Sequence, residues 1–337
     1  MLSRFLNHWF TQDVFVLASF ALVFGLLRAG SRNERWQRAG SRLKRDRTGL
    51  IALAVVVVYL TIGALEIFQI PANNGTRSIL DVFASGVSPE KSYSAPFADS
   101  LLDSAQHEKL HGRHLLGTDV LGKDVLVQML KACRTALIIG GLTSAIYVPL
   151  GALLGVLAGY FRRWVDDAIQ YIYSTLASIP EILLLVAILM VLGRGLGTMS
   201  IALGVTGWVG LCRLIRGETM RQAERPYVTA ARALGQTHWK IIVRHLMPNV
   251  MHLVLISAIL GFSNIVLAEA ILSYLGVGAP VGTASWGVMI DAGRTELGRD
   301  PLVWWNITAA TAALFGFILA LNLLGDSLRR AFDPKRT

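Results

Sequence analysis

The chain has 337 residues, of which 53% are hydrophobic and only 16% are charged, a composition too apolar for an ordinary soluble domain. Its net charge of +10 would also suit a nucleic-acid-binding protein. The basic residues, however, lie in short loops beside long apolar runs, which is the positive-inside pattern of a membrane protein and argues against nucleic acid as a partner.

The amino-terminal region combines a short apolar run with a strongly basic segment. Residues 14–27 are apolar, but a helical span takes about 20 residues. We predict an extra transmembrane helix here, with an interfacial helix as the alternative. Residues 28–47 carry eight Lys or Arg against Glu34 and Asp46, so they are predicted to be cytoplasmic. Residues 1–48 are therefore expected to form an extra helix and a basic cytoplasmic loop, with the N-terminus outside.

The first span of the core is predicted at residues 49–70, and the polar residues 71–115 after it form an external loop or small subdomain. His107, His111 and His114 recur there at spacings that would place them on one helical face. No cysteine or pair of carboxylates completes a metal-ligand set. We therefore expect a polar surface helix or loop and no metal.

The external loop ends in the sequence LGTDVLGKD, residues 116–124. Thr118 or Asp119 is suited to cap the helix that begins here, and Gly122 permits close packing. These structural roles are favoured over contact with a substrate.

The rest of the core, residues 116–337, contains further apolar runs joined by short polar turns. Gly151, Gly155 and Gly159 recur at every fourth position of one run, so they line a face where another helix can pack closely. The external segment 276–300 is predicted to contain a packed portion. The further spans are predicted at residues 136–160, 171–192, 198–215, 250–275 and 301–324.

Two carboxylates lie within the predicted spans: Glu181, which with Pro180 interrupts the span at residues 171–192, and Glu269. Carboxylates in a membrane are costly and face a bundle interior or a wet cavity, so a structural or gating role is favoured, with substrate contact as the alternative. The two cysteines, Cys133 and Cys212, have no paired spacing and are interpreted as small helix-packing residues.

A polar, basic segment at residues 213–249 separates two of the spans. It begins with a short helix-forming run that Gly235 interrupts, and a positive φ is expected there. Trp239, Ile242 and Leu246 share one face of the second short helix, and Pro248 marks the boundary with the next span. Such a pair of helices can offer an aromatic and apolar ridge to a soluble partner; an ordinary amphipathic loop is the alternative.

The sequence YVTAARALGQTHWKIIVRHLMPN, residues 227–249, resembles the EAA loop of ABC importer permeases, although Thr229 replaces the usual glutamate. In that family the loop docks on the ATPase. LGTDVLGKD resembles the LGTDxxGRD signature of the dipeptide, oligopeptide and nickel subgroup, and SYLGVGAP, SWGVMI and NLLGDSLRRAFDP resemble its later signatures. The resemblance covers roughly residues 40–337.

The resemblance implies an all-α, polytopic bundle of transmembrane helices in the inner membrane, with six family-like spans and one extra N-terminal helix. A second homologous permease, two ATPase subunits and an external solute-binding protein would be its partners, and peptides or similar small solutes its cargo. The implied ATPase-coupling positions are Tyr227, Ala230, Ala231, Gly235, Trp239, Ile242 and Pro248. The subgroup signature positions are Gly117, Thr118, Asp119, Gly122 and Asp124.

No GxxxxGK[ST] loop occurs in the sequence, so ATP is expected on the partner subunits and no cofactor on this chain. No nucleophile–base set can be defended, which argues against an enzyme. The other alternative is an ion-coupled secondary transporter. The scarcity of charge within the spans and the helical cytoplasmic loop argue against it.

Overall fold

The computed structural model describes residues 34–67, 69–72, 75–83, 89–102, 109–280 and 282–332. They form a bundle of helices with one small antiparallel pair of strands, β1 (Gln69–Ala72) and β2 (Gly75–Ser78). The expected polytopic all-α bundle is confirmed, since five helical segments are long and apolar enough to cross a membrane. The predicted extra helix at residues 14–27 and His107 lie outside the described residues.

The membrane-spanning segments follow the predicted runs closely. The single-helix spans are α4 (Arg47–Ile67), α6 (Val125–Phe161) and α15 (Trp305–Phe332). Two further spans are composite, α9 (Leu196–Thr206) with α10 (Trp208–Ala223), and α12 (His238–Ile241) with the π-helical η1 (Ile242–Leu246) and α13 (Met247–Tyr274). The shorter helices are α3 (Glu34–Leu43), α5 (Ile79–Phe83), α11 (Pro226–Ala233) and α14 (Trp286–Glu296).

The span predicted at residues 171–192 is broken. Its two parts are α7 (Arg163–Ala177) and α8 (Glu181–Leu192), which are bent by 85° against each other. Pro180 explains the break, because it has no N–H to donate and disfavours a helical conformation at the residue before it. The interruption expected at Pro180 and Glu181 is therefore confirmed, and α8 begins directly after it at Glu181.

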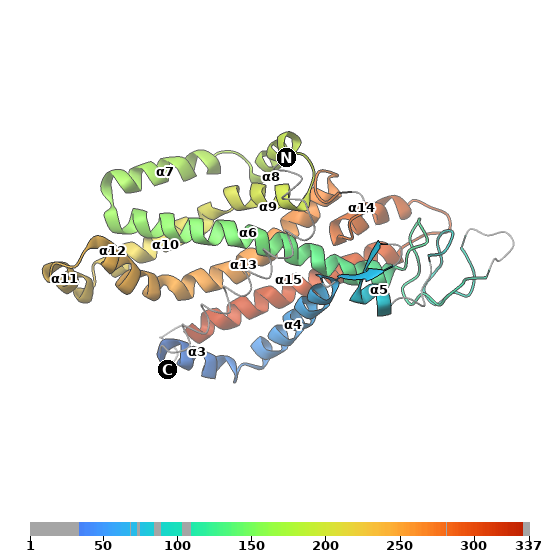
Figure 1. Cartoon of the computed structure of the whole chain (residues 1–337), viewed down its shortest axis with the longest axis horizontal. Coiled ribbons are helices and arrows are strands. Elements are labelled where there is room, and N and C mark those ends of the chain that lie inside the picture. Colours follow the sequence, from blue (N-terminus) through green and yellow to red (C-terminus); the bar gives the residue numbers. More distant parts are fainter. Residues whose placement is uncertain are drawn as a thin grey trace.

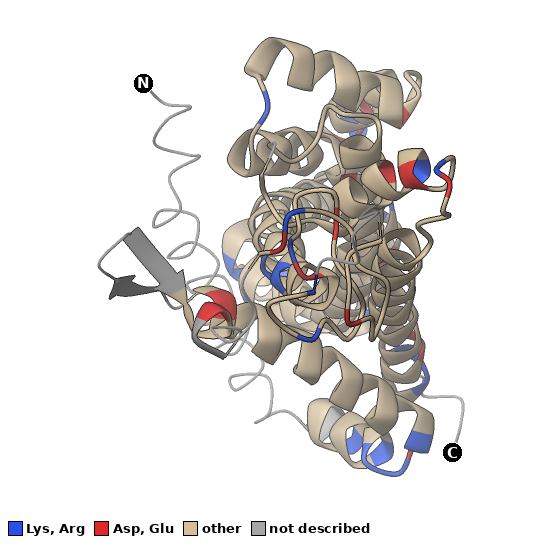
Figure 2. Ribbon diagram, turned by 90° about the vertical axis from the view of Figure 1, so that its right-hand side faces the viewer, with Lys and Arg blue, Asp and Glu red and all other residues tan. Residues whose placement is uncertain are grey.

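The basic segments lie at one end of the bundle. Figure 1 shows α3, α11, α12 and the turn between α6 and α7 at its left end, and α5 and α14 toward its right end. Figure 2 looks onto the right-hand end and shows the charged residues mainly in loops and at helix ends. This arrangement fits the expectation that the three basic loops share the cytoplasmic face.

The glycines of α6 pack against α10, as predicted. A Cβ atom added at Gly151, Gly155 and Gly159 would lie 3.0, 2.8 and 2.7 Å, respectively, from backbone carbonyl oxygens of α10. Only glycine permits so close an approach without a shift of one helix. Cys212 lies in the same contact and is fully buried, and Cys133 is buried on α6, so both cysteines are packing residues.

The signature segment 116–124 fastens the external loop to the start of α6. Gly122 has φ +70°, and an added Cβ would lie 1.7 Å from the Glu90 carbonyl oxygen, so the expected close packing is confirmed. The predicted cap was wrong. Asp124 caps α6, accepting a hydrogen bond from the Val127 N–H at 2.9 Å. Asp119 instead accepts from N–H groups of its own turn, because the helix begins only after that turn.

The other signature residues also attach the external loop to the helices. Thr118 is fully buried and donates its hydroxyl to the Ser92 carbonyl at 2.8 Å. The indole of Trp305, at the start of α15, donates to the Thr118 carbonyl at 3.0 Å. Gly117 has φ +73°, where an added Cβ would lie 2.4 Å from the Ser94 carbonyl oxygen. The segment thus joins the external loop to both α6 and α15.

A buried histidine completes this attachment. His114 is fully buried, with Nδ1 2.9 Å from Asp124 Oδ2 and Nε2 3.4 Å from Glu90 Oε1. His111 Nδ1 lies 3.0 Å from the other oxygen of Glu90. His111 and His114 lie in irregular chain, which fits the expected loop, but His114 is buried and not on the surface. Burial opposes the ionisation of Glu90, but hydrogen bonds from His111, His114 and Gly112 outweigh it and hold the pKa of Glu90 below its ordinary value.

Candidate coupling tip and membrane cavity

The basic end of the bundle carries a helical tip, defined here as residues 226–241. Helix α11 ends at Ala233, and Gly235 follows with φ +72°, its N–H donating to the Arg232 carbonyl at 3.0 Å. Helix α12 begins after Thr237, whose hydroxyl accepts from the Lys240 N–H at 3.4 Å. The prediction of two short helices joined at a glycine with positive φ is confirmed.

The tip presents large apolar side chains to its surroundings. Leu234 is 81% exposed, Trp239 is 61% exposed and Tyr227 is 38% exposed. Leu234, directly before Gly235, was missed by the sequence analysis because it was assigned to the helix rather than to the turn. The available signal was a large apolar side chain directly before Gly235, at the C-cap of α11. Exposed large apolar side chains in one place are typical of interaction sites.

Some of the other expected coupling positions are exposed and some are buried. Ala230 and Pro248 are exposed, whereas Ala231 is 4% and Ile242 is 1% exposed. Ile242 therefore packs in the core. The prediction from its spacing, that it projects beside Trp239, is wrong. Ile242 shares the buried side of the continuous helix from His238 to Tyr274 with Ile241 and Leu246, whereas Trp239, about 60° away around the helix axis, lies on the exposed side. A π-helical turn follows, in which the Met247 N–H donates to the Ile242 carbonyl.

The predicted boundary at Pro248 coincides with the start of α13, but the helix does not break there. Pro248 lies in the first turn of α13, within the continuous helix that begins at His238. The π-helical turn directly before it shifts the hydrogen-bond pattern, so the missing N–H of the proline is accommodated. The tip is consequently joined to α13 without a flexible linker.

The base of the tip is also fastened to α6. The Tyr160 hydroxyl lies 2.9 Å from His238 Nδ1, and the Arg232 guanidinium lies 4.9 Å from the centre of the Tyr160 ring. Arg162 forms an ion pair with Glu224 at 2.8 Å, beside the start of α11. A force on the tip would therefore be transmitted to α6 and α13 together.

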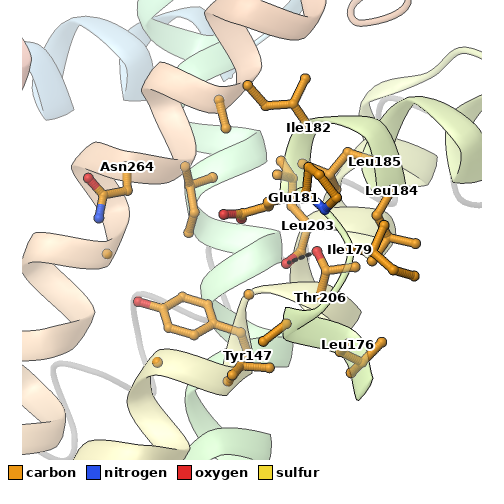
Figure 3. A pocket seen from close by; sticks show the side chains of 18 of the residues that line it. Tyr147, Leu176, Ile179, Glu181, Ile182, Leu184, Leu185, Leu203, Thr206 and Asn264 are labelled. Carbon is orange, nitrogen blue, oxygen red and sulfur yellow. Dashed lines mark hydrogen bonds between the residues drawn. The ribbon is translucent and has the colours of Figure 1, made fainter. Parts of the chain in front are cut away.

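A cavity of about 670 Å³ opens among α6, α8, α10 and α13 on the apolar part of the bundle. Most of its lining is aliphatic. Figure 3 shows the labelled polar side chains of Glu181, Tyr147 and Asn264, which line this space from α8, α6 and α13, together with Thr206 at the end of α9. Glu181 is the first residue after the break at Pro180, so the break places a carboxylate at the cavity.

Some polar side chains of the cavity form hydrogen bonds within the protein, and others do not. The Tyr147 hydroxyl donates to the Ala258 carbonyl at 3.4 Å, and the Thr206 hydroxyl donates to the Ala202 carbonyl at 2.9 Å. Within the described part of the chain, Glu181 and Asn264 are exposed to the cavity and neither forms a side-chain hydrogen bond or an ion pair. Both therefore have unused hydrogen-bonding capacity toward the cavity.

Glu269, the other carboxylate expected at a cavity, is placed differently. It is 1% exposed and accepts hydrogen bonds from the hydroxyls of Ser273 and Ser285, each at 2.7 Å. Ser285 is the N-cap of α14, so Glu269 joins the outer end of α13 to that helix. This geometry supports the structural role that the sequence analysis favoured for this residue.

These features define a multi-pass α-helical membrane protein with an exposed helical tip and a cavity among its spans. Residues 151–337 match the model of a family described as the binding-protein-dependent transport system inner membrane component. The chain belongs to this family.

The relatives of this chain are named as permease proteins of peptide or glutathione transport systems. The chain is 34% identical over 222 residues to the dipeptide transport system permease protein DppC of Bacillus subtilis, covering 66% of this chain and 69% of the relative. It is 35% identical over 255 residues to the di/tripeptide transport system permease protein DppC of Pseudomonas aeruginosa, covering 75% and 83%. It is 33% identical over 222 residues to the glutathione transport system permease protein GsiD of Pectobacterium atrosepticum, covering 66% and 73%.

The family and the relatives establish the role in outline. The chain is the membrane permease subunit of an ABC importer and a multi-pass protein of the inner membrane. It is a transport component that works with other parts of such an importer. The alternative of an ion-coupled secondary transporter is not supported.

Proposed function

We propose that this permease moves peptides inward, together with a second homologous permease that encloses the other side of the path. Peptide cargo is supported by the names of the relatives, which transport dipeptides, oligopeptides or glutathione. An external solute-binding protein delivers the cargo. Two ATPase subunits supply the energy and hold the ATP, and this chain, which has no GxxxxGK[ST] loop, holds no nucleotide.

The helical tip is the docking element for the ATPase. One observation carries this proposal, namely the exposed pair Leu234 and Trp239 on a tip that is anchored to both α6 and α13. An exposed tryptophan is an anchor of the kind that dominates binding energy at protein interfaces, and Leu234 adds exposed apolar surface on the same tip. Because the tip continues into spans that line the cavity, movement of the ATPase is passed directly to the path.

Transport by the assembled importer tests this proposal. Proteoliposomes that contain both permeases and both ATPases, with ATP inside and the binding protein outside, should accumulate labelled dialanine. Omission of ATP or of the binding protein should abolish accumulation. Accumulation driven instead by a proton or sodium gradient, without ATP, would contradict the proposal.

A further inference from the structure

The cavity combines an apolar lining with two unpartnered polar groups, and this combination points to a particular ligand chemistry. A carboxylate in the apolar layer is costly unless it faces water or a cationic partner. Glu181 faces the cavity, and Arg213, the cation among the lining residues, stacks on the Tyr173 ring at 4.7 Å and forms no ion pair with it. A cationic group that enters the cavity can therefore still pair with the Glu181 carboxylate.

We propose that Glu181 and Asn264 form a binding site for the protonated amino group and the adjoining peptide group of the cargo. The carboxylate of Glu181 accepts hydrogen bonds from the ammonium group, which is the strong, charge-assisted kind. The amide of Asn264 provides both a donor and an acceptor, which match the C=O and N–H of a peptide bond. This assignment rests on the proposed peptide cargo and adds which end of the peptide is recognised.

The size and lining of the cavity fit this occupant. A volume of about 670 Å³ lies within the range of small-molecule sites, about 300–1,000 Å³. Leu185, Leu203 and Ile265 are among the aliphatic side chains that line it. They tolerate many side chains of a peptide without selecting one, because apolar contact is not directional. The site thus recognises the amino group and the peptide group, which all short peptides share.

A basic side chain of the partner permease is the competing occupant for Glu181. A single guanidinium or ammonium group would fill only a small part of the cavity and would leave Asn264 without a partner. The cavity volume and the second polar group therefore favour a small solute over one inserted side chain.

Chemical protection of Glu181 tests the site directly. The assembled importer in nanodiscs is treated with dicyclohexylcarbodiimide, which modifies carboxylic acids in apolar surroundings, and labelling is measured by mass spectrometry. We expect labelling of Glu181 to fall at least tenfold with dialanine and to be unchanged with N-acetyl-dialanine, which lacks the amino group. Glu269, buried and bonded to two serines, is the internal reference. Equal protection by both compounds, no protection by either, or no labelling of Glu181 in the assembled importer would overturn the proposal.

Transport by variants separates this site from the proposed function. Glu181→Gln should raise the KM for dialanine about tenfold or more, the change for loss of one charged hydrogen bond. Asp291→Asn, which removes a negative charge from the surface of α14, should leave KM unchanged. If wild type imports dialanine with ATP and Glu181→Gln has the same KM, the site is wrong while the peptide function stands. If wild type imports no peptide, the proposed function fails on its own.

Discussion

Replacing the α6 glycines by alanine perturbs the contact between α6 and α10 in a graded way. In a helix interior with free space, alanine in place of glycine stabilises by about 1 kcal/mol. In a tight contact, the extra methyl group costs about 1–3 kcal/mol through overpacking. The added Cβ would lie 3.0 Å from an α10 carbonyl oxygen at Gly151 and 2.7 Å at Gly159. The gain in helix stability and the cost of overpacking therefore nearly cancel at Gly151, whereas the cost of overpacking is larger at Gly159.

The expected order of stability follows from these distances. Gly217 of α10 has no atom within 4 Å of an added Cβ, so Gly217→Ala is the matched control and should gain about 1 kcal/mol. Gly151→Ala should resemble wild type. Gly155→Ala and Gly159→Ala should lose stability, the latter by about 1–2 kcal/mol.

Thermal unfolding in detergent measures this order. A thiol-reactive fluorophore reports unfolding because both cysteines, Cys133 and Cys212, are buried in the folded protein. The midpoint should be highest for Gly217→Ala and lowest for Gly159→Ala. An equal rise in the midpoint for all four alanine variants would show that α6 and α10 do not approach closely, and would refute the reasoning.

Two further predictions concern the external attachment. His114→Ala removes the imidazole between two carboxylates and should destabilise the fold by about 3–5 kcal/mol, measured by thermal unfolding. The His111 side chain is 68% exposed, so His111→Ala should cost less than about 1 kcal/mol. Equal losses of stability in the two variants would contradict the buried position of His114. The folded-state pKa of Glu90 is lowered from 4.5, so its ionised form stabilises the fold above that pH and this contribution is lost as pH falls through the folded pKa. Glu90→Gln should therefore lower the unfolding midpoint at pH 7 and weaken its fall below about pH 4.5; an unchanged acid dependence would exclude this role of Glu90.

Local sequence patterns predicted the parts of the structure that depend on local physics. The spacing of Gly151, Gly155 and Gly159 predicted a close helix contact, because i and i+4 positions lie on one face of a helix. Gly235 predicted a left-handed turn, because few other residues adopt that conformation. The apolar runs predicted the spans, since a membrane requires a length of about 20 residues.

The features that were missed depend on long-range contacts or on subtle backbone changes. His114 is held by Glu90 and Asp124, and no sequence period connects these three positions. Ile242 was placed beside Trp239 because positions three apart on a helix are neighbours, yet the edge between the exposed and the buried side of the helix falls between these two residues. Pro180 predicted the interruption of the span at residues 171–192, but a proline alone does not fix the 85° bend between α7 and α8.

Docking of the ATPase on the helical tip is the central claim and can be measured by recovery of the ATPase. The variants are Leu234→Ala and Trp239→Ala at the tip, together with Gly235→Val, which strains a residue with φ +72°. Trp304→Ala is the matched control, because Trp304 is 49% exposed and precedes α15 at the opposite end of the bundle from the tip.

The measurement is affinity purification of the permease at matched membrane abundance, with the bound ATPase quantified. Loss of an apolar interface anchor costs about 2 kcal/mol or more, which corresponds to an affinity about 30-fold lower. We expect the three tip variants to insert normally, lose most of the ATPase and fail to couple ATP hydrolysis to uptake, whereas Trp304→Ala retains the ATPase. Normal ATPase recovery and normal uptake in all three tip variants would contradict the account.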